Sequence, residues 1–249
     1  MRRFGLIGFP IAHSFSQRHF TEKFEREGRS DCRYDLYPLP SIQDFLPLLE
    51  QHPDLEGLNV TIPYKVQVLD YLSECHPAAA AIGAVNTIAV REGKLLGFNT
   101  DAPGFERSLE GFLPAGFSSR ALILGTGGAS RAVRFVLETM GIACTLVSRT
   151  PSPGVLTYND LDASVIDGHL LIVQTTSLGM SPKVDTTPDL PFSFLSGNHY
   201  LYDLVYNPGE TLFLTQGRRR GCKVKNGLEM LYLQAEKAWE IWNTPSYIW

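Results

Sequence analysis

A glycine cluster between two apolar segments is the strongest sign of chemistry in the sequence. The apolar run Ala121–Leu124 has the length of a strand and ends at Gly125–Ala129, and a helix-compatible segment follows through Met140. In such a unit Gly125 makes the sharp turn and Gly127 lets the backbone approach a pyrophosphate, while the amides that open the helix hold the phosphate charge. The pattern predicts half of a dinucleotide-binding unit; an ordinary strand-to-helix turn is the alternative.

One arginine indicates which dinucleotide is bound. A second strand-like run, Ala143–Ser148, follows the helix, and Arg149 stands directly after it. Enzymes that select NAD place Asp or Glu near this point to bind the ribose 2′-hydroxyl, whereas an Arg accommodates the 2′-phosphate of NADP. Arg149 therefore favours NADP(H).

Two serines near the N-terminus have the chemistry to hold a carboxylate or a diol. Ser14 and Ser16 follow the apolar run Phe4–Phe9, and in an extended backbone two hydroxyls at this spacing point the same way. The alternative is that they cap a helix expected over Gln17–Glu27.

A second set of polar residues surrounds the end of a predicted strand. Leu58–Ile62 alternates apolar and polar residues like a half-buried strand, and Pro63 ends it. Asn59, Thr61 and Lys65 then lie near a strand end, where α/β folds usually bind their ligands. A solvated surface charge is the alternative for Lys65 considered alone.

The remaining elements alternate between strands and helices. Asp101 follows a predicted strand and could simply cap the helix that starts around Pro103. After Gly227, apolar residues recur at helical spacing through Trp242, which predicts a helix with a broad apolar face. The other expected elements are strands at Tyr34–Leu39, Ala84–Val90 and Leu95–Phe98, helices at Ile42–Leu49 and Ala78–Ala81, a helix end at Gly83 and a hairpin turn at Glu92-Gly93.

The composition fits a globular protein and argues against several classes. The 249 residues suffice for one large or two modest domains, and 44% of them are hydrophobic. With a net charge of -4, the basic run Arg218–Arg220 is more typical of a solvated helix end than of a nucleic-acid surface. The four cysteines form neither a disulfide framework nor a zinc pattern, which fits a reducing cytoplasm. Pro10 interrupts the apolar N-terminal run, so we expect a buried strand rather than a signal peptide, and no run is long enough to span a membrane.

Motifs along nearly the whole chain resemble the shikimate dehydrogenase family, in the same order and at similar spacing. Those of the first half and of the glycine turn are Gly5–Ser16, Asn59–Lys65, Gly83–Ile88, Gly97–Asp101 and Gly125–Ala132. Those of the second half are Thr176–Met180, Asp203–Pro208 and Asn226–Leu231.

The resemblance implies roles for the residues at matching positions. Lys65 and Asp101 correspond to the catalytic pair of the family. Positions that hold the substrate's carboxylate and ring hydroxyls are matched by Ser14, Ser16, Thr61, Asn86, Asp101, Tyr206 and Gln234. The phosphate turn is matched by Gly125, Thr126, Gly127, Gly128 and Ala129, the adenosine end by Ser148, Arg149 and Thr150, and the surroundings of the nicotinamide by Leu204 and Gly227.

The chain departs from the family pattern at three places. Gln17 and Phe20 stand where the family usually has Pro and Asn, just after the second serine. Ser148 stands where Asn is common, which removes an amide. Gln174-Thr175 replaces Asn-Ala, beside the positions matched to the nicotinamide.

The implied activity is the reversible NADPH-dependent reduction of 3-dehydroshikimate to shikimate, in chorismate and aromatic amino acid biosynthesis. Reducing a ketone takes a hydride on one face of the carbonyl and a proton for its oxygen. We expect Lys65 to stabilise the developing charge and to act as general acid/base, with Asp101 as its partner; either residue could move the proton in the rate-limiting step. Two alternatives remain, a broader quinate/shikimate dehydrogenase that uses NAD or NADP, and a non-catalytic NADP-binding regulator.

The expected fold is α/β with two domains. Residues 1–101 and 228–249 form an open α/β substrate-binding catalytic domain, and residues 102–227 form a Rossmann-like, doubly wound NADP-binding domain. The C-terminal helix returns to the first domain and turns Gln234 toward a cleft where substrate and cofactor meet. The expected partner is a small-molecule substrate, without metal, nucleic acid or membrane, and the chain is expected to be a cytoplasmic monomer or homodimer.

Overall fold

The computed structural model describes residues 1–12 and 14–244. The last residues of the predicted first domain, 245–249, therefore lie outside the described part of the chain. Among the residues described, no helix is long and apolar enough to cross a membrane.

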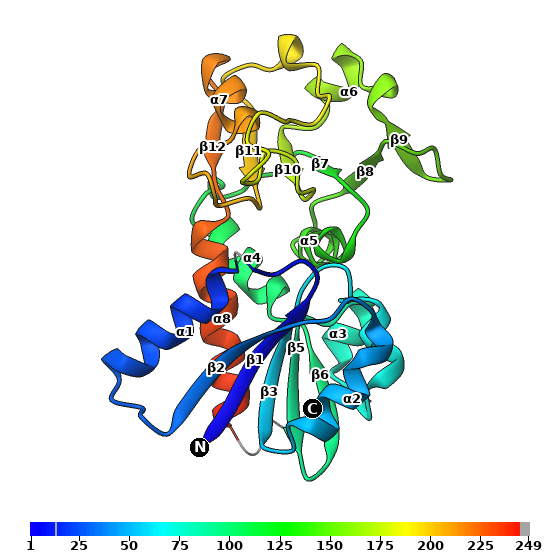
Figure 1. Ribbon diagram of the computed structural model, residues 1–249. Coiled ribbons are helices and arrows are strands. Elements are labelled where there is room, and N and C mark those ends of the chain that lie inside the picture. The colour runs from blue at the N-terminus through cyan, green and yellow to red at the C-terminus, as the bar shows by residue number, and fades with distance from the viewer. Residues whose placement is uncertain (13, 245–249) are drawn as a thin grey trace. The chain divides into compact units, whose positions relative to one another are not determined.

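The chain forms two compact units. The first contains Met1–Thr100 and the chain from Ala235 onward, and the second contains Asp101–Gln234. The chain thus enters the second unit directly after Thr100 and returns to the first within its last helix, which is drawn in red in Figure 1.

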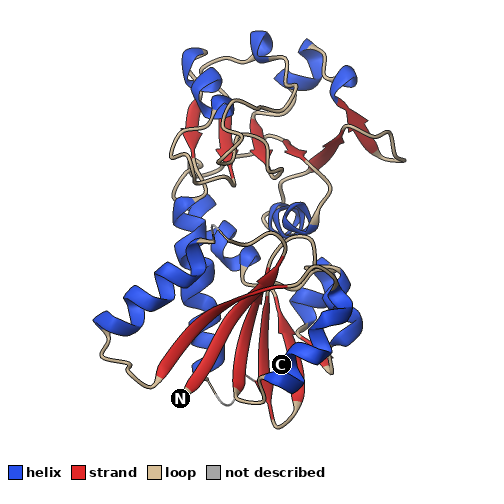
Figure 2. Ribbon diagram, in the orientation of Figure 1, coloured by secondary structure: helices blue, strands red, loops and turns tan. Residues whose placement is uncertain are grey.

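The first unit is built on a six-stranded mixed sheet with the order β2-β1-β3-β5-β6-β4. Its strands are β1 (Arg2–Gly8), β2 (Cys32–Pro38), β3 (Leu55–Val60), β4 (Glu74–Cys75), β5 (Thr87–Arg91) and β6 (Lys94–Phe98). β1 runs parallel to β2 and β3, β4 runs parallel to β6, and β5 is antiparallel to both of its neighbours. Figure 2 shows this sheet as a fan of arrows with helices along it.

Hydrophobic clusters cover both faces of this sheet. The helices are α1 (Phe15–Arg26), η1 (Ile42–Asp44), α2 (Phe45–Gln51), η2 (Gln67–Tyr71), α3 (Pro77–Ile82) and the C-terminal part of α8 (Leu228–Asn243). On one face, Phe4 of β1 packs with Phe20 of α1 and Trp242 of α8. On the opposite face, Ile7 of β1 packs with Phe45 of α2. Each face of the sheet is therefore buried, as an α/β layer architecture requires.

Trp242 fastens the returning helix α8 to the sheet. Its indole Nε1 donates to the carbonyl of Ile88 at 3.0 Å, and its ring stacks on Phe4 with the centroids 4.9 Å apart. Gly57 of β3 makes room for the indole, because a Cβ at this position would overlap it. The predicted packing of the C-terminal helix on the first domain is confirmed.

The second unit is built on a six-stranded parallel sheet with the order β12-β11-β10-β7-β8-β9. Its strands are β7 (Ala121–Leu124), β8 (Cys144–Ser148), β9 (Val155–Thr157), β10 (Leu171–Gln174), β11 (Tyr200–Asp203) and β12 (Lys223–Lys225). The order reverses between β7 and β10, which is the doubly wound arrangement in which dinucleotides bind at the switch point.

The helices of the second unit begin with α4 (Asp101–Glu110), which precedes the first strand of this sheet, and the others lie between or after the strands along the chain. The others are α5 (Gly128–Thr139), η3 (Tyr158–Asp160), α6 (Ala163–Asp167), η4 (Phe192–Phe194), α7 (Leu212–Arg219) and the N-terminal part of α8. Arg218–Arg220 ends α7 and is exposed, as predicted. The α/β prediction with two domains and a doubly wound second sheet is confirmed.

Most of the predicted local features of the first unit are present. Gly83 ends α3 in the left-handed conformation, and Glu92-Gly93 forms the hairpin turn with positive φ at both residues. The prediction of a half-buried strand through Ile62 is wrong. β3 ends at Val60, and five of its six residues are buried. The reason is its central place in the sheet, between β1 and β5 and under helices on both faces.

Candidate active site

The glycine turn follows β7 in the second unit. Gly125 has φ +121°, a conformation that side chains rarely adopt, and its amide donates to the carbonyl of Val147 at 2.9 Å. A Cβ at Gly127 would meet nothing within 4 Å, so the space beside it is open. Gly127 is the N-cap of α5 and supplies no side-chain cap, which leaves the amides of the first turn uncapped by a side chain. This turn has the open backbone and the helix N-terminus that a phosphate needs.

The segment after β8 lies beside this turn. β8 pairs in parallel with β7, so Ser148-Arg149-Thr150 and the glycine turn leave the same edge of the sheet. The Ser148 hydroxyl accepts from the Thr150 amide at 3.2 Å, and Arg149 is exposed. Burial raises the pKa of Tyr158, and the nearby Arg149 charge lowers it in part. The two predicted phosphate-binding segments are therefore brought together.

The Gln174-Thr175 departure has a structural explanation. Gln174 is fully buried, and its amide nitrogen donates to the carbonyls of Thr176 and Leu178 at 3.3 and 3.1 Å. Its carbonyl accepts from the Thr176 amide at 2.7 Å. The Thr175 hydroxyl donates to the carbonyl of Leu124 at 2.8 Å, and it is the atom that a Cβ on Gly125 would meet at 2.6 Å. Both residues thus brace the loops beside the glycine turn.

The predicted nicotinamide-side residues are adjacent. The Leu204 amide continues the sheet by donating to the Gln174 carbonyl at 3.0 Å, and the Gly227 amide donates to the Val205 carbonyl at 3.2 Å. A side chain at Gly227 would overlap the Leu204 carbonyl, so only glycine permits this close approach. Tyr206 lies two residues after Leu204 in the chain and is half-buried.

A buried carboxylate precedes Leu204. Asp203 is fully buried, and it accepts from the Thr211 hydroxyl at 2.6 Å and from the Val205 amide at 2.9 Å. Burial raises its pKa from 3.8 to about 6, against the lowering effect of these two hydrogen bonds. The Asp203 carboxyl group therefore binds its proton more tightly in the folded chain than in the unfolded chain.

Asp203→Asn is expected to reduce the loss of stability between pH 4 and pH 6. Because the folded-state pKa is raised, the stability linked to Asp203 is present below about pH 4 and is lost as the pH rises to about 6. The shift corresponds to a change on the order of 2–3 kcal/mol in the free energy of unfolding. Urea denaturation of both proteins at pH 4.5 and pH 7 measures it.

The control for this prediction is Asp162→Asn, because hydrogen bonds at the N-cap of α6 lower the pKa of Asp162. Removal of the Asp162 carboxylate should lower stability at neutral pH. It should change the slope of stability against pH in the opposite sense to Asp203→Asn. Equal slopes for wild type and Asp203→Asn would contradict the prediction.

The two serines of the first unit have different backbone settings. Ser14 is the N-cap of α1 in extended conformation, and its hydroxyl accepts from the Ser16 amide at 3.2 Å. Ser16 lies in the first turn of the helix, so the extended backbone in which both hydroxyls would point the same way is not present at Ser16. The helix begins at Phe15 because the Ser14 oxygen satisfies one of its free amides. The predicted capping alternative is thus seen for Ser14, whose hydroxyl proton remains available for a ligand.

Thr61 and Lys65 stand in a tight turn after β3. The Thr61 amide donates to the Ile7 carbonyl at 2.9 Å, and the Thr61 carbonyl accepts from Tyr64 at 2.9 Å. The Lys65 carbonyl accepts from the Val85 amide at 2.7 Å, and the Lys65 side chain is half-buried. The turn is therefore fixed to the end of β1 and to the segment before β5.

Asn86 belongs to a buried polar network. Its amide nitrogen donates to the Thr100 hydroxyl at 2.9 Å, and its carbonyl accepts from the Thr100 amide at 2.6 Å. Asn59 donates to the Thr87 hydroxyl and to the Asn86 backbone carbonyl at 3.2 and 3.3 Å, and accepts from the Tyr34 hydroxyl at 2.8 Å. The network fixes Asn86, directly before β5, and Thr100, the residue that precedes Asp101.

Tyr34, Asn59, Thr87 and Thr100 are not among the predicted site residues. Asn59 stood out only as a polar residue near a strand end. Tyr34 carried no local signal, because its partner Asn59 is 25 residues away along the chain. Only pairing across the sheet brings these side chains together.

Asp101 and Gln234 lie in the second unit. Asp101 is the first residue of α4 and only 6% exposed, so it stands within the helix rather than before it as a cap. The side-chain amide nitrogen of Gln234 donates to the Leu231 carbonyl of its own helix at 2.9 Å. A Cβ on Gly104 would lie 3.2 Å from the Gln234 Cβ, so α4 and α8 approach closely beside Asp101.

Residues 6–88 match a protein-family model described as the shikimate dehydrogenase substrate binding domain. The chain is 41% identical to the shikimate dehydrogenase (NADP(+)) of Moorella thermoacetica, over 95% of this chain and 86% of that relative. It is 38% identical to the protein of the same name from Desulforamulus reducens, over 96% of this chain and 88% of the relative.

The chain is also similar to a protein whose structure was solved with ligands bound. The shikimate 5-dehydrogenase of Thermus thermophilus, in complex with NADP(H) and shikimate, is 34% identical to this chain. It has a TM-score of 0.86, and the match covers 98% of this chain and 94% of that one.

Proposed function

We propose that this chain, which belongs to the shikimate dehydrogenase family, catalyses the reversible NADPH-dependent reduction of 3-dehydroshikimate to shikimate. The observation that carries the proposal is the similarity to NADP(+)-dependent shikimate dehydrogenases over nearly the whole chain. The broader quinate dehydrogenase and the non-catalytic regulator are not favoured by these relatives.

The residues of the second unit fit NADP(H). The open space beside Gly127 and the uncapped first turn of α5 suit a pyrophosphate, and the exposed Arg149 suits a 2′-phosphate. Gly125–Ala129 and Ser148–Thr150 would hold the phosphates and the adenosine end, and Leu204 and Gly227 the nicotinamide side. When bound, the cofactor supplies the hydride.

The polar residues of the first unit suit a small ring acid with several hydroxyls. We assign Ser14, Ser16, Thr61 and Asn86 to the carboxylate and the hydroxyls, together with Tyr206 and Gln234 of the second unit. Asn86 is only 3% exposed, and both ends of its side-chain amide are bonded to Thr100, so its position is fixed. A site of this kind rejects analogues that leave its buried polar groups unpaired.

Lys65 and Asp101 are assigned to proton transfer. An ammonium at the carbonyl oxygen stabilises the negative charge that develops there and then delivers the proton. The Asp101 carboxylate would orient the reacting hydroxyl and help to pass the proton. Burial of Asp101 strengthens both effects, because charges interact more strongly away from water.

The domain roles follow the same assignment. We assign substrate binding and catalysis mainly to the first unit, which contains the matched family segment at 6–88, and NADP(H) binding to the second. For a biosynthetic enzyme with this cofactor we propose the cytoplasm as its location.

The initial rate of NADP+ reduction with shikimate, followed at 340 nm, tests the function. Parallel assays use quinate in place of shikimate and NAD+ in place of NADP+, at matched concentrations. We expect fast turnover only with shikimate and NADP+. Comparable rates with quinate or NAD+ would instead support the broader-specificity relative, and NADPH binding without turnover on any pair would support the regulator.

A further inference from the structure

Thr100 contacts both ends of the Asn86 side-chain amide. The backbone amide of Thr100 donates to the Asn86 Oδ1 at 2.6 Å, and its hydroxyl accepts from the Asn86 Nδ2 at 2.9 Å. Thr100 is fully buried. A flipped Asn86 amide would place its NH2 group against the Thr100 N–H, so that two donors would face each other. The contact with Thr100 therefore selects one orientation of the Asn86 amide.

The backbone of Asn86 is held by other partners. Its amide donates to the Phe98 carbonyl at 3.1 Å, and its carbonyl accepts from the Val60 amide at 2.8 Å and from the Asn59 side chain at 3.3 Å. These bonds come from the ends of β3 and β6 and do not involve the Thr100 hydroxyl. This hydroxyl therefore acts on the side chain of Asn86 and not on its backbone.

The hydroxyl protons of the network favour the same orientation. The Thr87 hydroxyl accepts from the Asn59 side chain at 3.2 Å, and its own proton can go to the Asn86 Oδ1 at 3.3 Å or to the Thr100 hydroxyl at 3.1 Å. The Thr100 proton can go to the Asn86 Oδ1 at 3.2 Å or to the Thr87 hydroxyl. However the two hydroxyls share their protons, the Asn86 Oδ1 is the final acceptor. Its Nδ2 is thus kept as the donor end.

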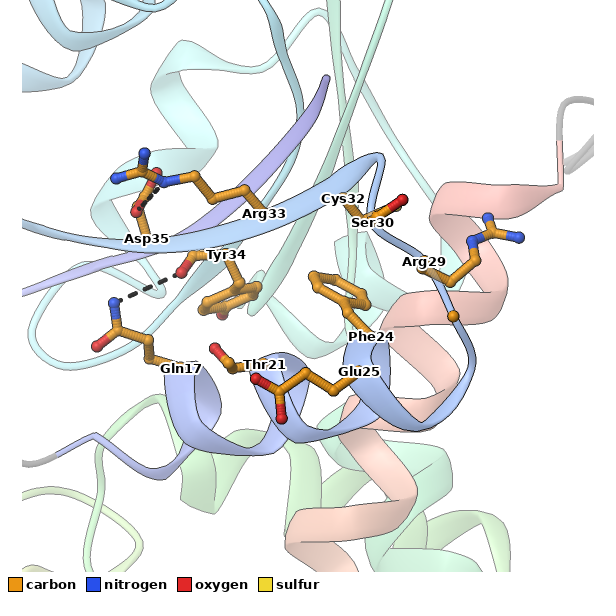
Figure 3. A pocket seen from close by; sticks show the side chains of 11 residues that line it. Gln17, Thr21, Phe24, Glu25, Arg29, Ser30, Cys32, Arg33, Tyr34 and Asp35 are labelled. Atoms are coloured by element: carbon orange, nitrogen blue, oxygen red, sulfur yellow. Dashed lines mark hydrogen bonds and ion pairs between the residues drawn. The ribbon is translucent and has the colours of Figure 1, made fainter.

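The network is shielded from water on the side of β2. Figure 3 shows Tyr34, whose hydroxyl donates to the Asn59 Oδ1 at 2.8 Å, in the wall of a hollow between α1 and β2. Although the hollow opens beside it, Tyr34 is only 3% exposed, and Thr87 and Thr100 are fully buried. Water from the hollow is therefore a poor substitute for a hydroxyl removed from the network. Such a removal leaves a buried polar group unsatisfied, which costs more than the loss of an exposed hydrogen bond.

We propose that Thr100 is a positioning residue that holds the Asn86 amide at the angle the substrate requires. The inference rests on the proposed function, in which Asn86 contacts shikimate. Thr100 is itself buried and acts through Asn86, so its loss should weaken shikimate binding. The alternative role for Thr100 is to place Asp101, the next residue in the chain, and this role predicts a fall in kcat instead.

Thr100→Val tests the hydroxyl alone. The substitution keeps the size of the side chain and the backbone bond to the Asn86 Oδ1, but removes the acceptor of the Asn86 Nδ2. A hydrogen bond of this kind affects equilibria by about three- to tenfold, so we expect KM and Kd for shikimate to rise by that factor. kcat and KM for NADP+ should change less than about twofold. Isothermal titration calorimetry measures Kd without turnover.

Three further variants make the test specific. Thr100→Ser keeps the hydroxyl and should bind shikimate nearly as well as the wild type. On an Asn86→Ala background, Thr100→Val should no longer weaken shikimate binding, because Thr100 acts through Asn86. The matched control is Thr145→Val, the same substitution in the second unit, where the hydroxyl lies 3.3 Å from the His169 Nε2. It should leave KM for shikimate unchanged, and a thermal melt of each variant measures any loss of stability.

Crystal structures of Thr100→Val and Thr100→Ser give a readout that does not depend on binding. We expect the Asn86 amide to leave its wild-type plane in the valine variant and to keep it in the serine variant. An unchanged Asn86 in the valine variant would overturn the proposal. The same weakening of shikimate binding with and without Asn86 would also overturn it, as would a fall in kcat with Kd unchanged.

The proposed function can fail separately. A wild type that neither binds nor oxidises shikimate would overturn that function, and the comparison of the Asn86 amide between the two crystal structures would still decide whether Thr100 positions it.

Discussion

Lys65→Ala is expected to lower kcat for shikimate oxidation by about 10²–10⁴-fold, the range that a positioned acid or base contributes. The substitution removes both the proton carrier and the positive charge that stabilises the developing oxyanion. Because the glycine turn and Arg149 lie in the second unit, the affinity for NADPH should stay within about twofold. Steady-state kinetics and a fluorescence titration with NADPH measure the two effects.

The control for Lys65 is Lys94→Ala. Lys94 is an exposed lysine of the same unit that pairs with Glu74 at 2.9 Å, so it tests the loss of a surface charge alone. Its activity should match the wild type. Near-normal turnover of Lys65→Ala would remove Lys65 from the mechanism, and a thermal melt of each variant shows whether the fold is intact.

Arg149→Ala is expected to raise KM for NADPH by about 10–100-fold, the loss of a charge-assisted contact with the 2′-phosphate. KM for NADH should hardly change, because NADH carries a hydroxyl at that position. The variant should therefore lose most of its preference between the two cofactors. Initial rates with NADPH and NADH over a range of concentrations measure this ratio.

Arg134→Ala is the matched control for Arg149. Arg134 is an exposed arginine on α5 that pairs with Glu138 at 2.7 Å, one helical turn away. Its loss should leave both KM values unchanged. If Arg149→Ala raised KM for NADPH and for NADH equally, Arg149 would not be contacting the 2′-phosphate.

The nucleotide unit could be predicted well because its signals are local. The glycine turn, the apolar strand before it and the helix after it occupy one short stretch, and each needs only its neighbours in the chain. Gly125 makes the sharp turn that the pattern predicted, with a φ of +121°. The bracing role of Gln174 was not visible, because its partners at Thr176 and Leu178 depend on the conformation of a loop.

The substrate unit was harder to predict because its contacts are distant in the chain. The start of α1 was expected two residues too late, since the strength of the Ser14 cap depends on backbone geometry. The burial of β3 depends on which strands flank it, and alternation of residue types does not show that. The link from Tyr34 of β2 through Asn59 of β3 to Asn86 joins distant parts of the chain, so no single motif contains it.

The division of the chain into units has a consequence for synthesis on the ribosome. The first hundred residues emerge first, but the core beneath their sheet needs Ala238 and Trp242, which are translated only after the whole second unit. At about 5–20 residues per second, the first unit waits on the order of 10 to 30 s for these side chains. Until then the face of Phe4 and Phe20 is uncovered, which makes the nascent N-terminal segment a natural client for chaperones that bind exposed apolar surfaces.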